Sequence, residues 1–418
     1  MIHVLVMGLP LVAGLILALL AHRGGWAPPL VVALGTGAVL RVVVMVVAVQ
    51  DPWQPWDMAE DFKSTADTVL DGRDPLVYLR EGGWHFLPML AYLLAGMREL
   101  GNFLGIPWTV MGRVVPVLAD LALIPLVAKL TEGREGDPGR GARHAFQYAC
   151  APPVLMVSAL HGQFPPITLA LGIAALPAAR NGRVSLTGLL IGLSVTTANW
   201  AALLLPGVLM TTRGWRARLG VLGWTAFVPL AFLVSSVPLL GTPVRELPES
   251  VAKSLSARAV IGDWGWTALV TGGRQAVEPG FGSIGMPVLV LGLLAAAWWW
   301  RKAGPIRLTL ALLLVFLIVT YRFGTQYLLW PIPYLLMLSR RGTLPVITVS
   351  GLWAAFGYLY MSRLDEFAWR DTHVWWAFSS FVVIALFVYV LPERRAPEPD
   401  EPPAEPPRSP SHATAAST

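Results

Sequence analysis

Charged residues and cysteine are both scarce in this chain. Only 13% of its 418 residues are Asp, Glu, Lys or Arg, about half the share found in an ordinary soluble domain. The chain has a single cysteine, Cys150, which lies in an apolar run. Because there is only one, an intrachain disulfide and a metal cluster held by cysteines are both excluded. The sequence also lacks a Walker-type Gly-rich Lys loop and zinc-ligand spacing, so it does not support cytoplasmic nucleotide chemistry. We therefore expect no metal ligands and no cofactor, and the sequence leaves the dependence on a divalent metal open.

The chain is rich in long apolar runs. Hydrophobic residues make up 55% of the chain, and a helix needs about 20 of them in succession to cross a bilayer. Candidate spans lie at 2–21, 29–49, 107–129, 144–160, 164–179, 219–240, 284–300, 305–320, 326–339, 343–361 and 373–391. With two ambiguous segments added, the sequence predicts an all-α, polytopic transmembrane bundle of about 11–13 membrane segments.

Two segments, 185–210 and 86–101, do not have the pattern of simple spans. The first is apolar but is interrupted at Thr196, Thr197 and Asn199, and it has basic residues on both flanks. This pattern predicts two half-length helices that form a hairpin. The second is short and either dips into the membrane and returns or crosses it outright. With both treated as non-crossing, the Arg-rich loops all fall on one side, as the positive-inside rule requires.

Membrane orientation and domain limits follow from the same charge pattern. The net charge of +6 is carried largely by short loops, so we attribute it to orientation and expect no nucleic-acid partner. Residues 1–392 are the predicted membrane domain of a multi-pass cell-membrane protein. Its N-terminus and two large loops, 50–85 and 241–283, are expected outside. Residues 393–418 are rich in Pro, Glu, Ser and Ala, which predicts a disordered cytoplasmic tail.

The first external loop carries three acids in five positions directly after a span: Asp57, Glu60 and Asp61. Apolar residues recur from Met58 to Val69 at three- and four-residue steps, which predicts an amphipathic helix lying in the membrane interface. Helical geometry places Asp57 and Asp61 on one face, one turn apart. Partial burial would raise the pKa of a carboxylate there toward that of a general base, and Asp57 is the first choice. The alternative is that these acids only solvate the loop and balance nearby basic residues.

Short sequence islands follow one another between about residues 50 and 335. They are the acidic loop with Gly-Arg-Asp-Pro at 72–75 and Phe-Leu-Pro-Met-Leu at 86–90, His-Gly-Gln-Phe at 161–164, Gly-Leu-Leu-Ile-Gly at 188–192, and Gln-Tyr-Leu-Leu-Trp-Pro-Ile-Pro at 326–333. In this order they resemble motifs of the GT-C superfamily of integral membrane glycosyltransferases, and especially its bacterial, mannosyltransferase-like members. Two positions depart from the family pattern. Pro165 stands where an Asp commonly follows His-Gly-Gln-Phe, and Asn199 stands near a position where the family often has Lys.

The resemblance implies a specific reaction on the extracytoplasmic face. A polyprenyl-phosphate sugar enters laterally from the lipid, and an Asp of the first loop deprotonates a hydroxyl of a glycolipid or cell-envelope glycan acceptor. A hexose, with mannose expected, is then transferred with inversion. On this pattern Asp57 is the base and Asp61 the second candidate. The expected substrate-binding residues are Glu60, Lys63, Arg73, His85, His161, Gln163, Asn199, Trp264, Arg322, Gln326 and Tyr327.

Several of these residues also have a simpler explanation. Arg322 would stabilise the charge on the leaving phosphate, although an isolated Arg at the end of a span also snorkels to the interface. Trp264 would stack on a sugar, but Trp also anchors helices at the interface. His161 and Gln163 would line a water-filled cavity, and Gln163 also suits a simple turn between helices. The loop cations either bind phosphate or pair with neighbouring acids.

Two other classes of protein share this composition. A transporter or flippase of a lipid-linked sugar would need a similar number of spans, but transporters tend to have matching broken helices in two symmetric halves. The segment near Asn199 has no obvious counterpart in the second half of the chain. A structural membrane scaffold would leave the clustered acids and the His-Gly-Gln turn without a role. The sequence therefore favours an enzyme.

Overall fold

Helices make up almost all of the described chain. The computed structural model describes residues 2–78, 84, 86–135, 138–255 and 260–394. Within these ranges, seven helices are long and apolar enough to cross a membrane: Val4–Arg23, Leu30–Gln50, Trp108–Thr131, Trp215–Leu240, Gly282–Trp299, Thr343–Arg363 and Glu366–Tyr389. Shorter apolar helices lie at Pro152–His161, Val184–Thr197, Asn199–Thr211 and Pro305–Val319. The protein is therefore an all-α, multi-pass membrane protein, as the sequence predicts. The predicted tail lies outside the described residues from 395 onward.

The elements have the following bounds. The α-helices are α1 (Ile2–Arg23), α2 (Leu30–Gln50), α3 (Phe62–Leu70), α4 (Pro75–Tyr78), α5 (Pro88–Leu104), α6 (Trp108–Glu135), α7 (Pro138–Cys150), α8 (Pro152–Leu155), α9 (Pro165–Arg180), α10 (Val184–Thr197), α11 (Leu205–Thr211), α12 (Trp215–Leu240), α13 (Leu247–Leu255), α14 (Gly265–Thr271), α15 (Gly282–Trp299), α16 (Pro305–Val319), α17 (Ile332–Met337), α18 (Thr343–Ala355) and α19 (Glu366–Tyr389). Short 3₁₀ turns lie at Asn199–Leu204, Val244–Glu246, Pro279–Phe281, Thr325–Leu329 and Met361–Arg363. Two short antiparallel strands, β1 (Val260–Ile261) and β2 (Ala276–Val277), pair in the loop after α13.

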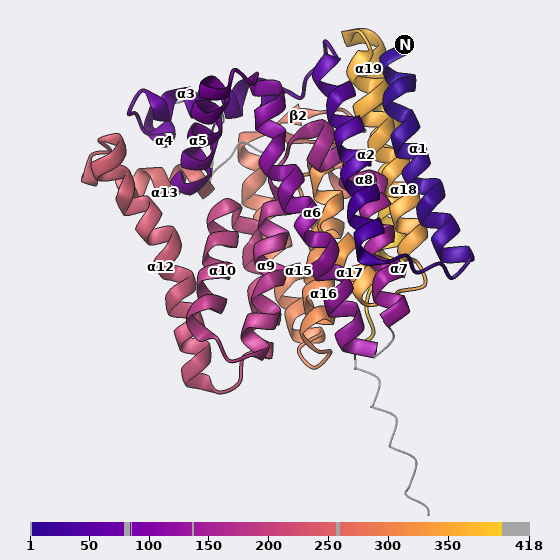
Figure 1. Ribbon diagram of the computed structural model, residues 1–418. Coiled ribbons are helices and arrows are strands. Elements are labelled where there is room, and N and C mark those ends of the chain that lie inside the picture. Colours follow the sequence, from indigo (N-terminus) through magenta and orange to yellow (C-terminus); the bar gives the residue numbers. More distant parts are fainter. Residues whose placement is uncertain (1, 79–83, 85, 136–137, 256–259, 395–418) are drawn as a thin grey trace, which may run out of the picture.

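The long helices stand side by side as one bundle (Figure 1). Helices α1, α2, α18 and α19 lie together on one side, and α10 and α12 pack on the other, with α6 and α9 between them. Large apolar side chains point outward from the bundle, among them Leu9, Leu239 and Leu291, each more than 60% exposed. Such a surface is costly in water and is satisfied by lipid chains.

The segment 185–210 forms the predicted hairpin of half-length helices. Helix α10 ends at Thr197, the chain is extended at Ala198, and a 3₁₀ turn leads into α11. Thr187 near the start of α10 and Arg213 after α11 line one small cavity, so the two basic flanks meet at the same end. Glycines let α10 approach α12 closely, because a Cβ at Gly188 would lie 2.4 Å from the Cβ of Trp224.

The first large loop forms the predicted amphipathic helix. Met58, Phe62 and Ala66 are fully or almost fully buried, while Glu60 and Lys63 are exposed. The buried face packs on α5, and an ion pair of 2.9 Å between the Arg98 Nε and Asp67 Oδ1 atoms joins the two helices. Helix α5 lies beside α3 at one end of the bundle (Figure 1). This arrangement fixes the position of the acidic residues that precede α3.

Two predicted spans, 144–160 and 326–339, are not single helices. The first is divided at Ala151 into α7, the four-residue α8 and a π-helical turn, Met156–His161. The second consists of the 3₁₀ turn Thr325–Leu329 and the short α17. Prolines 152, 153, 331 and 333 explain both interruptions, because proline has no backbone N–H to continue a helix. Hydrophobicity alone did not reveal these breaks.

A buried charge network joins α2, α6 and α7 inside the bundle. The Arg41 Nε atom lies 2.7 Å from the Asp120 Oδ2 atom, and both side chains are completely buried. Tyr148 and Ser158 donate hydroxyl hydrogen bonds of 2.6 Å to the two oxygens of Asp120. Arg41 also donates to the carbonyl oxygens of Gly37 and Ala149. Both charged residues lie inside predicted apolar spans, 29–49 and 107–129, and no local pattern in the sequence indicates that they pair.

Candidate active site

Asp57 is the centre of a hydrogen-bonded cluster contributed by segments far apart in the sequence. Its Oδ1 atom lies 2.6 Å from the His161 Nε2 atom, and its Oδ2 atom accepts a hydrogen bond from the amide of Gln163. The other ring nitrogen of His161, Nδ1, lies 2.6 Å from the hydroxyl of Tyr358. Both ring nitrogens of His161 therefore have an oxygen partner, and an ionised Asp57 can accept from His161 and from Gln163.

Each of the main members of this cluster comes from a π-helical turn. In the part of the chain that the structure describes, these turns are Asp57–Asp61, Met156–His161 and Phe356–Tyr360. They carry Asp57, His161 and Tyr358 respectively. A π-turn is much rarer than an α-turn and is frequently found at functional sites. The coincidence of all three turns at one cluster therefore indicates a site and not only a packing contact.

Gly162 allows His161 and Gln163 to face the same carboxylate. Its φ of +75° lies in the left-handed region, which L-residues other than glycine rarely adopt. A Cβ at this position would also lie 3.1 Å from the Cγ of Arg113. The left-handed residue ends the π-turn, and the Gln163 N–H then donates to the carbonyl of Val157 at 3.0 Å. The His-Gly-Gln sequence is thus a turn that presents two donors to Asp57.

Three further contacts hold the loop before Asp57 in place. Arg363 forms a two-point ion pair with Asp51, with 2.6 Å between its Nη1 atom and Oδ1. Arg113 donates to the Gln54 side chain at 2.8 Å and to the Leu160 carbonyl at 2.9 Å. The Trp108 indole donates to the Met58 carbonyl at 2.8 Å. Asp57 is therefore positioned by helices from both halves of the chain.

Two cavities meet at Asp57. The larger has a volume of about 710 Å³ and contains His161 and Tyr358 in its wall together with many aromatic rings. The smaller has a volume of about 130 Å³ and is lined by Asp61, Gln163, Trp84, Asn199, Trp200, Gln326 and Tyr327, among others. Asp57 lines both. Its partner His161 faces the larger cavity and its partner Gln163 faces the smaller, so one carboxylate is accessible from two spaces.

The two acids of this turn have opposite pKa shifts. Burial acts to raise the pKa of Asp57, but the charge and hydrogen bond of His161, with backbone hydrogen bonds, outweigh it and lower the pKa below its usual value. Burial and the charges of Asp57 and Glu60 raise the pKa of Asp61 to about 6. The expectation that burial raises the pKa holds for Asp61 and is wrong for Asp57. Asp57 is thus held as the ionised, hydrogen-bond-accepting form.

Replacing Asp61 by Asn should stabilise the protein at neutral pH. The pKa of Asp61 in the fold, about 6, lies above its unfolded value, so the ionised carboxylate costs stability fully above pH 6 and not at all below about pH 4. After allowance for solvent screening we expect a gain of about 1 kcal/mol, which corresponds to about 1 °C in melting temperature for a chain of 418 residues, at pH 7.5. Thermal scans of the solubilised protein should show the gain shrinking as the pH falls through 6.

The matched control is Asp71→Asn, which removes an exposed acid from the same loop. This variant should have the same melting temperature as the wild type at every pH, because the Asp71 side chain is exposed. A melting temperature of Asp61→Asn equal to or below that of the wild type at pH 7.5 would contradict the raised pKa.

A second Asp–His pair lines the larger cavity. The His373 Nε2 atom of α19 lies 2.8 Å from the Asp263 Oδ1 atom, and its Nδ1 atom lies 2.8 Å from the Gly273 carbonyl oxygen. The Gly273 carbonyl can only accept, so the imidazole donates to it through Nδ1. Gln275 donates to Asp263 from the start of β2 at 3.2 Å. The pair therefore presents a polar, proton-bearing patch in an aromatic cavity.

The structure brings together most, but not all, of the residues predicted from the sequence. Asp57, Asp61, His161, Gln163, Asn199, Gln326 and Tyr327 all line one or both cavities. Glu60, Lys63 and Arg73 are exposed and line neither. Arg322 follows Tyr321 at the same end, with its guanidinium 5.3 Å from that ring, and does not line either cavity. His85 lies outside the described residues.

Trp264 is buried in the protein core and does not line either cavity. It is 1% exposed, its indole donates to the Leu317 carbonyl at 2.7 Å, and its ring stacks on Phe323 at 3.9 Å. A sugar cannot reach this face, so the predicted stacking role does not fit the fold. The loop 241–283 nevertheless contributes to the site through Asp263, one residue earlier.

Tyr358 and His373 were not predicted from the sequence. His373 had a usable signal, because an ionisable residue at the start of an apolar run is a candidate for function by default. Tyr358 had none, since a tyrosine near the end of a span is common at the membrane interface. Its role follows only from its contact with His161.

Comparisons with family models and with curated proteins identify no function for this site. No family model matches the chain, and no curated protein matches it closely enough to be called a relative.

Proposed function

We propose that this protein is a membrane glycosyltransferase that moves a hexose from a polyprenyl-phosphate donor to a glycolipid or cell-envelope glycan. The observation that carries the proposal is the position of Asp57, an ionised carboxylate that lines two adjoining cavities and is held by His161 and Gln163. A reaction that joins two substrates by removing a proton from one of them needs a base at such a meeting point. The order of motifs that resembles GT-C enzymes supports the same conclusion.

The proposed step balances with no further reactant. A hydroxyl oxygen of the acceptor attacks the anomeric carbon of the donor sugar, and its proton passes to a carboxylate oxygen of Asp57. The bond between the anomeric carbon and the phosphate oxygen breaks, and its electron pair leaves with the polyprenyl phosphate. Attack from the side opposite the leaving group inverts the anomeric centre. Mannose is the proposed sugar, from the motif resemblance alone.

We assign the acceptor to the larger cavity and the donor sugar to the smaller one. The larger cavity combines rings such as Trp369 and Trp376 with the Asp263–His373 pair, and aromatic faces with a few polar groups are typical of sugar-binding sites. The smaller cavity offers the amides of Gln163, Asn199 and Gln326. These amides can donate hydrogen bonds to the hydroxyl groups of the sugar, and Arg322 would act on the phosphate only from outside this cavity.

Replacing Asp263 by Asn should weaken binding of the acceptor and leave the chemical step largely intact. The carboxylate accepts from His373 and Gln275 and faces the larger cavity, so its loss removes charge-assisted hydrogen bonding worth about tenfold or more in affinity. Steady-state kinetics with varied acceptor should show KM raised about tenfold, with kcat within about threefold of the wild type. The control Asp371→Asn removes an exposed acid from the same helix as His373 and should change neither constant. If the acceptor KM of Asp263→Asn equals that of the wild type, the acceptor does not bind in this cavity.

The proposed location is the cell membrane, with Asp57 facing the extracytoplasmic side. Arg180, Arg213, Arg140 and Arg340 lie in cavities at the ends of helices that lead away from Asp57. The positive-inside rule places these arginines in the cytoplasm. Asp57 then opens to the outside, where lipid-linked sugars and envelope glycans would meet.

The test is a transfer assay in proteoliposomes with a radiolabelled polyprenyl-phosphate hexose and extracted envelope glycolipids. We expect label to move from the donor lipid to a new product that survives mild acid, which cleaves the donor. A flippase would instead move the donor across the bilayer without changing its chemical form. Translocation of intact donor with no new product would overturn the enzyme proposal.

A further inference from the structure

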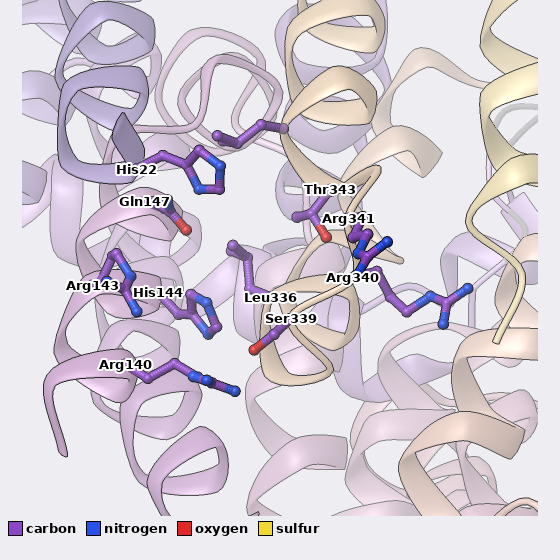
Figure 2. Close-up of a pocket in the computed structure, with 11 residues that line it drawn as sticks. His22, Arg140, Arg143, His144, Gln147, Leu336, Ser339, Arg340, Arg341 and Thr343 are labelled. Carbon is purple, nitrogen blue, oxygen red and sulfur yellow. The ribbon is translucent and has the colours of Figure 1, made fainter. Parts of the chain in front are cut away.

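A second polar cavity lies at the end of the bundle away from Asp57. Its volume is about 440 Å³. Met7 near the start of α1 lines a small cavity with Asp51, whereas His22 at the end of α1 lines this one, so the length of α1 separates the two sites. The wall is formed by the end of α1, the first turns of α7, and the connection between α17 and α18 (Figure 2).

The lining of this cavity is strongly basic. Arg140 and Arg143 come from α7, Arg340 and Arg341 come from the loop before α18, and the imidazoles of His22 and His144 lie between them. No Asp or Glu lines the cavity among the described residues. Glu393 pairs with Arg340 from outside the cavity, at 3.0 Å. The cavity therefore attracts an anion.

A buried amide provides an independent reason to expect a ligand. Gln147 is only 2% exposed and lines the cavity, yet its Nε2 atom has no hydrogen-bond partner within the described part of the chain. Figure 2 shows its amide directed into the space between α7 and the α17–α18 connection. The hydroxyl oxygen of Ser339, also without a partner there, lines the opposite wall. Buried donors left unsatisfied are costly, and an anionic oxygen would satisfy both.

We propose that this cavity binds a phosphate group, as carried by the headgroup of an anionic membrane lipid or by a soluble phosphate ester. Arginine forks match the oxygens of phosphate in a bidentate way, and hydroxyl and amide donors complete its coordination. Leu336 and Leu344 line the same cavity beside the cations. A basic pocket between membrane helices with apolar residues at its edge is suited to a lipid headgroup with its chains beside it.

The proposal does not depend on the glycosyl-transfer activity. The site lies at the far end of the helices and shares no lining residue with either cavity at Asp57. Binding here and catalysis there can be measured separately, so failure of one proposal leaves the other to be judged on its own assay.

Native mass spectrometry of the whole protein tests the site, with phosphatidylglycerol as the lipid probe. We expect the wild type, after removal of co-purified lipid, to bind phosphatidylglycerol at least about tenfold more tightly than phosphatidylcholine, and Arg140→Gln/Arg143→Gln to lose this preference. Arg140→Lys/Arg143→Lys keeps the positive charge and should retain most of the preference for phosphatidylglycerol. This variant controls for loss of binding caused by unfolding. Gln147→Leu, of similar volume, should weaken binding about threefold or more by removing the amide donor.

Two comparisons decide the result. Arg216→Gln removes an exposed arginine at the same end of the bundle and outside the cavity, and should leave the preference intact. Glycerol 3-phosphate in excess should displace the lipid if a soluble phosphate ester is the natural ligand and fail to do so if the headgroup and chains act together. Equal binding by the wild type and Arg140→Gln/Arg143→Gln, with either probe, would show that these arginines serve membrane orientation only.

Discussion

Asp57→Asn is expected to reduce the initial rate of hexose transfer by about 10²–10⁴-fold, the usual contribution of a general base. The substitution keeps the shape of the side chain, and its amide oxygen can still accept from Gln163. The carboxylate that would receive the acceptor proton is removed, so the loss should fall on kcat while the KM for the donor stays within about threefold. Proteoliposome assays with radiolabelled polyprenyl-phosphate hexose measure both constants.

The comparison with Asp61→Asn identifies the base. Asp61, whose pKa is raised to about 6, lines only the smaller cavity, so its loss should cost much less activity than the loss of Asp57. Asp71→Asn, exposed in the same loop, controls for the removal of a negative charge and should be fully active. Transfer by Asp57→Asn at the wild-type rate would exclude Asp57 as the base, and a large loss in Asp61→Asn alone would transfer the role to Asp61.

The second large effect is expected at the buried Arg41–Asp120 pair. Removing one partner of a fully buried ion pair leaves an uncompensated charge and typically costs about 3–5 kcal/mol. Arg41→Met and Asp120→Asn should therefore each lower the free energy of unfolding by about this amount. The double variant contains no buried charge, and the carbonyl oxygen of its Asn can still accept from one of the two hydroxyls, Tyr148 or Ser158, while its NH2 group donates toward the other. The double variant should be more stable than either single variant. A double-mutant cycle would report this difference as a coupling energy between Arg41 and Asp120.

Unfolding in mixed detergent micelles, followed by tryptophan fluorescence, measures these differences. The control is Asp67→Asn, which breaks the partly exposed pair with Arg98 and should cost at most about 1 kcal/mol. Additive losses in the double variant would mean that Arg41 and Asp120 stabilise the bundle independently. Because Ser158 belongs to the π-turn that carries His161, a destabilised Asp120→Asn should also have reduced transfer activity.

Apolar runs predicted the long helices closely because burial in lipid leaves few other solutions for the backbone. The predicted run 29–49 corresponds to the span Leu30–Gln50, and 107–129 to Trp108–Thr131. The runs 144–160 and 326–339 were wrong as single spans because prolines interrupt the hydrogen bonding of helices that hydrophobicity alone joins. The amphipathic pattern after Asp57 was confirmed because its period is set by the helix itself.

The candidate site was predicted only where a local pattern carried the signal. Asp57 was found from an acidic cluster after a span, and His161 and Gln163 from a short motif. Tyr358 and the Asp263–His373 pair were not found, because each acquires its significance from a partner about a hundred residues or more away. The direction of the Asp57 pKa shift was also mistaken, since it depends on the distance to His161 and not on burial alone.

The sequence by itself determined that this is an all-α membrane protein, which face of its first loop is buried, and which short segments carry polar groups. It could do so because hydrophobic length and helical period are properties of consecutive residues. Only the tertiary structure decided that Asp57 is held by His161 and Gln163 at the junction of two cavities, and that Arg41 and Asp120 form one pair. Those facts depend on how helices distant in the chain pack, and packing is set by all of the side chains together.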